Sequence, residues 1–489
     1  MSGAAHVPFT ETKAPESPER LHQGGLRLID ISASTMANIG PAYSFYFSAG
    51  AIVLAAGIGA PLTVLLAAIA IALLGNTLAQ FSRAHPSTGG FITFIGKTFG
   101  GTSAVTTALM AGAGYIVAIA SVLVISGGFL SMTLQYYFSW NVPWIVFTVL
   151  LTAGAIAMMI RGVGVSTKLA GFFFGFELLV LTIVSVAALI KHGAHLSAMP
   201  FEPKHLTNGF SGLADGFPLA IYLFIGWENS AALAEETDNP RRNVPRAVLL
   251  SIALMAVTYL LLTYSTVSSF GYNGTALDAA PLPFINVAHD VTPALAVFAY
   301  LAGLTSTIGV LIAAVNSQCR LIFNAGREGL LPRWIGKVHP TRRTPVNAIF
   351  TFTGIGAVIT LIWALGHLLG GSHQSGGMNA LNFYAESATM GTILILVVYF
   401  TANVALPFYY RKFLPSEFRP IKHVVLPVLG AIAIAVPVYY LCKPGQPQPY
   451  NWFPYAALGV LVVSIGYSVW LTRRDPDVAN RVGSIVADE

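Results

Sequence analysis

Two short breaks in long apolar segments decide the fold of this chain: Asn38-Ile39-Gly40-Pro41-Ala42-Tyr43-Ser44 and Ile225-Gly226-Trp227-Glu228-Asn229-Ser230. Each break lies about midway along a segment that is otherwise long enough to span a bilayer. Backbone that leaves the helical hydrogen-bond pattern at membrane depth is tolerated only where protein encloses it around a cavity. The two stretches therefore predict a site in the middle of the membrane, formed by two interrupted helices.

The composition is that of an all-α integral membrane protein. Of the 489 residues, 55% are hydrophobic and only 9% are charged, with a mean hydropathy of +0.69. A soluble chain would carry about a quarter charged residues. The net charge of +6 comes from Lys and Arg in the turns between apolar segments, so we expect a lipid bilayer as partner and no nucleic acid.

Runs of roughly 20 apolar residues predict twelve transmembrane helices. The predicted spans are 29–54, 60–82, 104–136, 143–160, 166–190, 212–235, 246–270, 293–323, 345–368, 380–409, 424–442 and 452–472. With both termini cytoplasmic, only Lys191, Lys204 and Lys443 fall outside, and the other 23 of the 26 Lys and Arg residues fall inside. This asymmetry follows the positive-inside rule and supports the orientation.

The positions of the breaks predict how the chain is divided. Spans 1 and 6 are interrupted, which is the spacing of two inverted five-helix repeats. The predicted parts are a cytoplasmic N-terminal tail at 1–28, a first repeat at 29–190, a second repeat at 212–409, two peripheral helices at 424–472 and a cytoplasmic C-terminal tail at 473–489.

Four stretches resemble the amino acid–polyamine–organocation (APC) permeases. They follow the order and topology of that family's loops after helices 2 and 4, its helix 6 and its helix 8. The matching residues are Ser87-Thr88-Gly89-Gly90-Phe91 with Phe99-Gly100, Arg161-Gly162-Val163, Phe224–Glu228 with Glu235-Glu236 and Asn239–Ala247, and Asn316-Ser317 with Arg320, Arg327–Pro332 and Thr344-Pro345.

The resemblance implies a LeuT-type fold and a secondary transporter of the cell membrane. Such carriers move amino acids, amines or polyamines as proton symporters or exchangers, and they are monomers or homodimers. It implies a proton gradient and no cofactor, although sodium coupling stays open. A polyamine or cationic amino acid carrier is the alternative within this class, and a transporter-like sensor or channel is the alternative outside it.

The first break is expected to bind the carboxylate of a substrate. A half-helix N-terminus offers free backbone N–H groups that suit an anion, and the carbonyls of a second broken helix suit a cation. Pro41 lacks an N–H, which removes one donor and leaves room for an amine substrate; alternatively, Pro41 only kinks the helix. The predicted substrate-binding residues are Asn38, Ile39, Gly40, Pro41, Ala42, Tyr43, Tyr115, Ile119, Tyr222, Ile225, Gly226 and Trp227.

Three acids lie in apolar spans, where each ionised carboxylate costs about 2.5–3.5 kcal/mol near the centre. Glu228, beside the second break, and Glu177, in the fifth span, are the predicted proton-coupling residues; capping of freed amides and hydrogen-bonded packing are the alternatives. In several of the APC permeases that this chain resembles, a lysine lies near the position of Glu177. Glu386 is predicted to attract cations in an outer vestibule, or to be a solvated helix-end acid.

A cytoplasmic gate is expected behind the second break. Its predicted charges are Glu235, Glu236, Arg241, Arg242 and Arg246, and an ordinary helix-end ion pair is the alternative. No motif supports an enzyme, and the absence of a G-x-x-x-x-G-K-[ST] nucleotide loop predicts that ATP is not the energy source. We also expect no metal site, because His and Cys lack the spacing of metal ligands.

Overall fold

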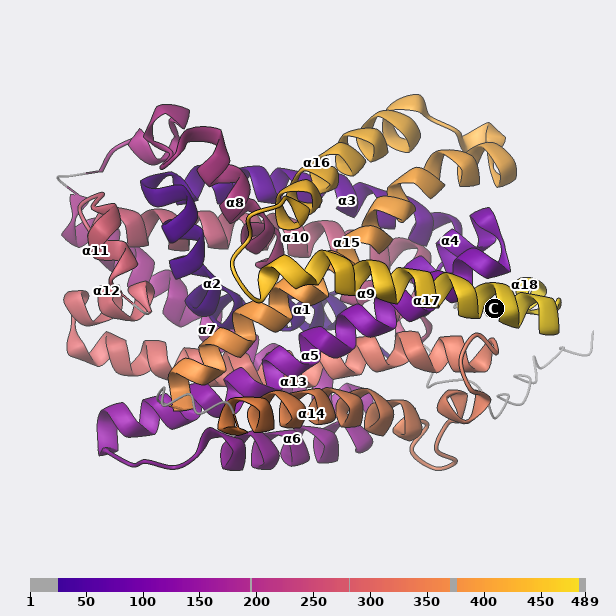
Figure 1. Cartoon of the computed structure of the whole chain (residues 1–489), viewed down its shortest axis with the longest axis horizontal. Helices are drawn as coiled ribbons and strands as arrows, with labels where there is room; N and C mark the ends of the chain where they lie inside the picture. Colours follow the sequence, from indigo (N-terminus) through magenta and orange to yellow (C-terminus); the bar gives the residue numbers. More distant parts are fainter. Residues whose placement is uncertain (1–24, 194–195, 281, 370–375, 483–489) are drawn as a thin grey trace, which may run out of the picture.

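The computed structural model describes residues 25–193, 196–280, 282–369 and 376–482. This part of the chain is helical, and a single parallel bridge joins Leu26 to Thr237 within it. The long helices run mostly along the long axis of the molecule (Figure 1). The helices are α1 (Leu28–Ile39), α2 (Pro41–Ala56), α3 (Ala60–Ala84), α4 (Phe91–Phe99), α5 (Gly101–Phe138), α6 (Trp144–Ile160), α7 (Val163–Lys191), α8 (Gly209–Tyr222), α9 (Asn229–Ala232), α10 (Pro240–Ser269), α11 (Gly274–Asp278), α12 (Pro283–Val291), α13 (Pro293–Arg327), α14 (Val346–Leu369), α15 (Gly376–Phe413), α16 (Leu426–Cys442), α17 (Phe453–Arg474) and α18 (Val478–Arg481).

Nine helical stretches of the described residues are long and apolar enough to cross a membrane. The first of them, Leu28–Ala84, contains α1, α2 and α3. The apolar helix α6 is shorter and is not one of the nine. This agrees with the predicted all-α integral membrane protein. The starts of helices follow local sequence: α13 begins where Thr292 caps Leu295 N at 3.2 Å and Pro293 occupies the first turn.

The central helices are buried, and the last two long helices, α16 and α17, are peripheral. The most extensive packing is between α5 and α15, between α10 and α3, and between α13 and α7. In the most apolar window of α5 and of α15, 72% of the residues are buried, whereas the shares are 22% in the stretch containing α16 and 17% in that containing α17. Exposed Leu458, Val462 and Val463 on α17 are apolar, as side chains that face lipid are.

The two ends of the molecule carry different short helices. α11 and α12 lie at one end, and α4 and α18 lie at the other (Figure 1). We call these the α11 end and the α18 end.

Both predicted tails contribute ordered residues. Most of the predicted N-terminal tail, residues 1–24, lies outside the described residues, but Leu26 N donates to Glu236 O at 2.9 Å and Asp238 N donates to Leu26 O at 2.8 Å. The predicted C-terminal tail includes α18, with Val478 and Val482 buried in a small core.

Arg481 connects α18 to the residues that follow α13 and α17. Its guanidinium contacts the Asp475 carboxylate at 2.5 Å and donates to Glu328 O at 3.0 Å. The hydrogen bond from Arg481 lowers the pKa of Asp475, so the contact persists in mild acid and is lost only when the pH falls through that lowered value.

Candidate functional site

The first helix interruption is at Gly40, between α1 and α2. Gly40 has φ 58° and ψ 78°, a left-handed conformation that glycine adopts without strain. A Cβ at this position would lie 2.0 Å from Val310 Cγ2 on α13. Both the backbone conformation and the closeness of α13 therefore require glycine here.

The amides at the start of α2 are occupied by side chains of other helices. Pro41 has no N–H, Ala42 N donates to Glu177 Oε2 at 3.1 Å, and Tyr43 N donates to Ser306 Oγ at 2.9 Å. The next amide, Ser44 N, already bonds to Gly40 O within the helical pattern at 2.8 Å. The free N–H groups expected from the sequence at this helix end are thus paired inside the protein.

The second interruption lies between α8 and α9. Residues 223–228 form turns, and Gly226 has φ 107°. Asn38 Nδ2 donates to Gly226 O at 3.3 Å, so the two interrupted segments meet. A Cβ at Gly226 would lie 2.8 Å from the Asn38 amide, which makes glycine necessary for this close approach.

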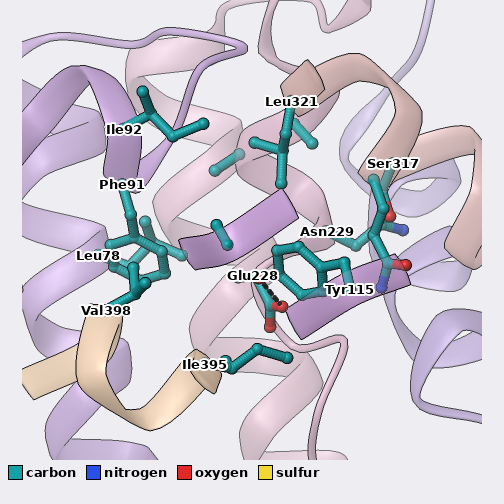
Figure 2. A pocket seen from close by; sticks show the side chains of 15 residues that line it. Leu78, Phe91, Ile92, Tyr115, Glu228, Asn229, Ser317, Leu321, Ile395 and Val398 are labelled. Atoms are coloured by element: carbon teal, nitrogen blue, oxygen red, sulfur yellow. Dashed lines mark hydrogen bonds between the residues drawn. The ribbon is translucent and has the colours of Figure 1, made fainter. Parts of the chain in front are cut away.

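Glu228, the last residue of this turn, is buried. The Tyr115 hydroxyl donates to Glu228 Oε1 at 2.6 Å, and Gly226 N donates to Oε2 at 3.2 Å. Figure 2 shows the Tyr115 hydroxyl pointing at the carboxylate. Both oxygens of this acid are therefore held by neutral donors, one from α5 and one from the turn.

Glu228 and Tyr115 line a small cavity of about 20 Å³, which we call the Glu228 cavity (Figure 2). Its lining residues are Leu78, Gly90, Phe91, Ile92, Ala111, Tyr115, Glu228, Asn229, Ala231, Ala232, Ser317, Gln318, Leu321, Ile395 and Val398. Two acceptors in this lining, Gln318 Oε1 and Asn229 Oδ1, are buried and have no hydrogen-bond partner in the described part of the chain. Together with the carboxylate, they can accept hydrogen bonds from a cation.

A second cavity of about 30 Å³, the central cavity, shares Gln318 with the first. Its lining residues are Asn38, Ile39, Tyr43, Ser44, Ala118, Ile119, Val122, Tyr222, Ile225, Val310, Ala314 and Gln318. The lining is mostly apolar and contains no charged side chain. Cavities of these sizes hold about one or two waters each, so an amino acid enters only if helices move.

The central cavity brings together half of the predicted substrate-binding residues. Six of them line it: Asn38, Ile39, Tyr43, Ile119, Tyr222 and Ile225. Tyr115 lines the Glu228 cavity instead, and Gly40 and Gly226 shape the two interruptions. Trp227 packs between Phe91 and Tyr399, with ring centroids at 6.1 and 5.5 Å.

An aromatic cluster lies at the central cavity, which Tyr43 and Tyr222 line. The hydroxyls of Tyr43, Tyr222 and Ser121 lie 3.4 Å from one another. The Tyr384 ring packs edge-on against Tyr43 and Tyr222, with centroids at 5.5 and 5.9 Å. Tyr384 is not among the predicted residues, because the sequence of an apolar span does not show which face of the helix an aromatic residue occupies.

Two buried ion pairs lie at the end of α13, and their arginines are not among the predicted gate charges. Glu236 contacts the Arg320 guanidinium at 2.6 and 3.1 Å, and Glu235 pairs with Arg327. Both arginines belong to α13, which packs against α9.

The sequence placed these acids near the arginines of α10 without predicting which arginine pairs with each acid. Arg241, Arg242 and Arg246 are exposed on α10, where Arg241 donates to the carbonyl of Ala84 at 3.2 Å. The reason is geometric, because these three side chains lie on the outer face of their helix while α13 brings its arginines to the acids from inside the protein.

Glu386 lies inside α15 rather than at its start. The indole N–H of Trp363 donates to Glu386 Oε2 at 3.3 Å, and the acid is partly buried. It is not among the residues that line either cavity.

Comparison with known proteins gives the family. The family model described as amino acid permease matches residues 26–465. The branched-chain amino acid permease BcaP of Lactococcus lactis is 27% identical over 51% of this chain and 50% of its own length, so the chain spans about half of that relative. BcaP of Bacillus subtilis is 23% identical over 83% of this chain and 85% of its own length.

Solved structures give the fold. A mutant of the manganese transporter of Eremococcus coleocola superposes with a TM-score of 0.57 at 10% identity, covering 94% of this chain and 98% of its own. The nucleobase-cation-symport-1 transporter MHP1 superposes with a TM-score of 0.53 at 13% identity, covering 96% and 98%. These are LeuT-like transporters, in agreement with the predicted fold. The family model covers most of the chain and its members are transporters rather than enzymes: this chain belongs to the amino acid permease family.

Proposed function

We propose that this protein is a secondary active transporter of small amino acids or related amines in the cell membrane, working by alternating access and coupled to protons. The observation that carries the proposal is Glu228, a buried carboxylate between two interrupted helices and at the wall of a closed cavity. An intramembrane acid in such a place marks a substrate or ion pathway. Its neutral partners leave it able to bind a proton or an ammonium during a cycle.

The proposed topology has twelve spans, with α1–α2 and α8–α9 as the broken first and sixth helices of two inverted repeats. Counting Leu28–Ala84 as two crossings, and adding α6 and α8–α9 to the other stretches, gives twelve. We assign the α18 end to the cytoplasm, because most Lys and Arg residues fall there. On this assignment both termini are cytoplasmic and α16 and α17 are peripheral, in a monomer or a homodimer.

The mechanism follows from the closure of both ends. The aromatic cluster of Tyr43, Tyr222 and Tyr384 would form the outer gate, and the pairs Glu235–Arg327 and Glu236–Arg320 the inner gate. A carrier passes through such an occluded state between its outward-open and inward-open states. The apolar lining of the central cavity suits an apolar side chain, and two relatives are named as branched-chain amino acid permeases, so leucine and valine are the first substrates to test.

Uptake into proteoliposomes tests the proposal. We expect leucine uptake to be accelerated by an imposed acid-outside pH gradient and not by a sodium gradient. Glu228→Gln should make the rate independent of pH, since the amide cannot exchange the proton. Glu202→Gln, at a half-exposed loop acid, is the matched control and should behave as wild type. Uptake driven by sodium alone would show that proton coupling is wrong.

A further inference from the structure

We infer that Glu177 takes the place of a substrate carboxylate at the start of α2, so that this carrier binds amines that lack a carboxylate about as well as the parent amino acids. The inference rests on the proposed function and specifies the substrate class of the same site.

The start of α2 is where a carboxylate would be expected to bind. The first turn of a helix has backbone N–H groups without partners in the helix, and its dipole favours a negative charge there. An amino acid that binds through such a turn supplies the anion itself. Here the protein supplies one, because Glu177 of α7 accepts the Ala42 N–H at 3.1 Å.

The remaining donors of this turn are also used. Pro41 carries no N–H, and Tyr43 N donates to Ser306 Oγ at 2.9 Å. The first three positions of α2 are thus satisfied by one acid and one hydroxyl, both from neighbouring helices, and none is left for a ligand.

Burial makes the arrangement stable and selective. Glu177 is 1% exposed and Ser306 is fully buried, so water does not replace them easily. A second carboxylate beside Glu177 would lose its hydration and find no free hydrogen-bond donor in return. The binding of a carboxylate here therefore gains no free donor and costs the free energy of desolvation.

Recognition of the ammonium does not need this turn. The unpartnered acceptors Gln318 Oε1 and Asn229 Oδ1 lie with the Glu228 carboxylate in the lining of the Glu228 cavity. The apolar part of a substrate faces the wall formed by Ile119 and Val310 in the central cavity. An alkyl ammonium ion satisfies both features without a carboxylate.

The test is a comparison of matched ligands on the purified full-length protein by isothermal titration calorimetry. Leucine is compared with isoamylamine, and valine with isobutylamine; each amine is the amino acid without its carboxylate. A site built to hydrogen-bond a polar group rejects the analogue without it by about 10⁴-fold or more. We expect instead that the two members of each pair differ less than about tenfold in Kd.

Variants of Glu177 test whether this acid sets the relative affinity for leucine and isoamylamine. Glu177→Ala frees the Ala42 N–H, so leucine binding should gain about tenfold or more relative to isoamylamine. Glu177→Gln keeps the shape and should give a smaller shift in the same direction. Glu202→Gln should leave the ratio at the wild-type value. If Glu177→Ala does not fold, the ratio of the two Kd values in the wild-type protein and in Glu177→Gln still tests the inference.

The outcomes separate the two proposals. Leucine bound at least a hundredfold more tightly than isoamylamine by the wild-type protein would overturn the inference and leave the proposed function standing. An unchanged ratio in both Glu177 variants would also overturn it. Binding of neither member of either pair by well-folded protein would overturn the proposed function, and the inference with it.

Discussion

Gly40 shows how much a single residue determines in this protein. It joins α1 to α2 with a left-handed backbone and lies against Val310 of α13. The sequence marks the position, because Gly-Pro in an apolar run interrupts a helix. The sequence does not show that α13 approaches so closely that a single methyl group overlaps Val310.

The Gly40→Ala substitution should therefore be severely destabilising. The left-handed conformation costs a non-glycine residue roughly 1–2 kcal/mol, and the overlap with Val310 adds to this cost. We expect a clear fall in the thermal unfolding temperature of the detergent-purified protein and loss of uptake. Gly50→Ala is the control, because a Cβ there meets nothing within 4 Å. Adding Val310→Ala should recover part of the loss; equal unfolding temperatures for Gly40→Ala and Gly50→Ala would contradict this account.

At the scale of helices, the sequence predicts which segments cross the membrane but not which faces meet. The apolar runs and the loop motifs indicated the fold and the family, and the comparisons confirm both. The contacts that build the site join distant residues: Glu177 and Ala42 are 135 positions apart, and Glu236 and Arg320 are 84 apart. In a chain that is apolar on nearly every face of every helix, the hydrophobic pattern does not give the rotation of a helix about its axis.

The proposed inner gate depends on ion pairs between residues far apart in the sequence. Arg320 is 1% exposed and pairs with Glu236. Arg320→Met leaves the Glu236 carboxylate buried without its partner, which costs about 3–5 kcal/mol. We expect a lower unfolding temperature and a faster leak of substrate from loaded proteoliposomes.

Arg242→Met removes an exposed arginine of the same predicted gate and serves as the control. The double exchange Glu236→Arg with Arg320→Glu should recover part of the stability, since it restores the pair in reverse. If Arg320→Met and Arg242→Met leak equally, the ion pair does not form the gate.

At the scale of the whole molecule, packing is graded from centre to edge. α5 and α15 are buried, α16 and α17 are mostly exposed, and both cavities lie among the central helices. In the proposed mechanism, aromatic rings close the site at one end and ion pairs close it at the other.

The bridge between Leu26 and Thr237 has a mechanical consequence. It joins the start of α1 to the segment after α9 through backbone hydrogen bonds, so we expect these two segments to move together during transport. A disulfide between Leu26→Cys and Thr237→Cys, with Cys319 and Cys442 replaced by serine, should leave uptake intact. A short bifunctional crosslink between Glu235→Cys and Arg327→Cys should stop uptake until it is reduced. Inhibition by the first crosslink would mean that the two half-helices slide past each other instead of sharing one hinge.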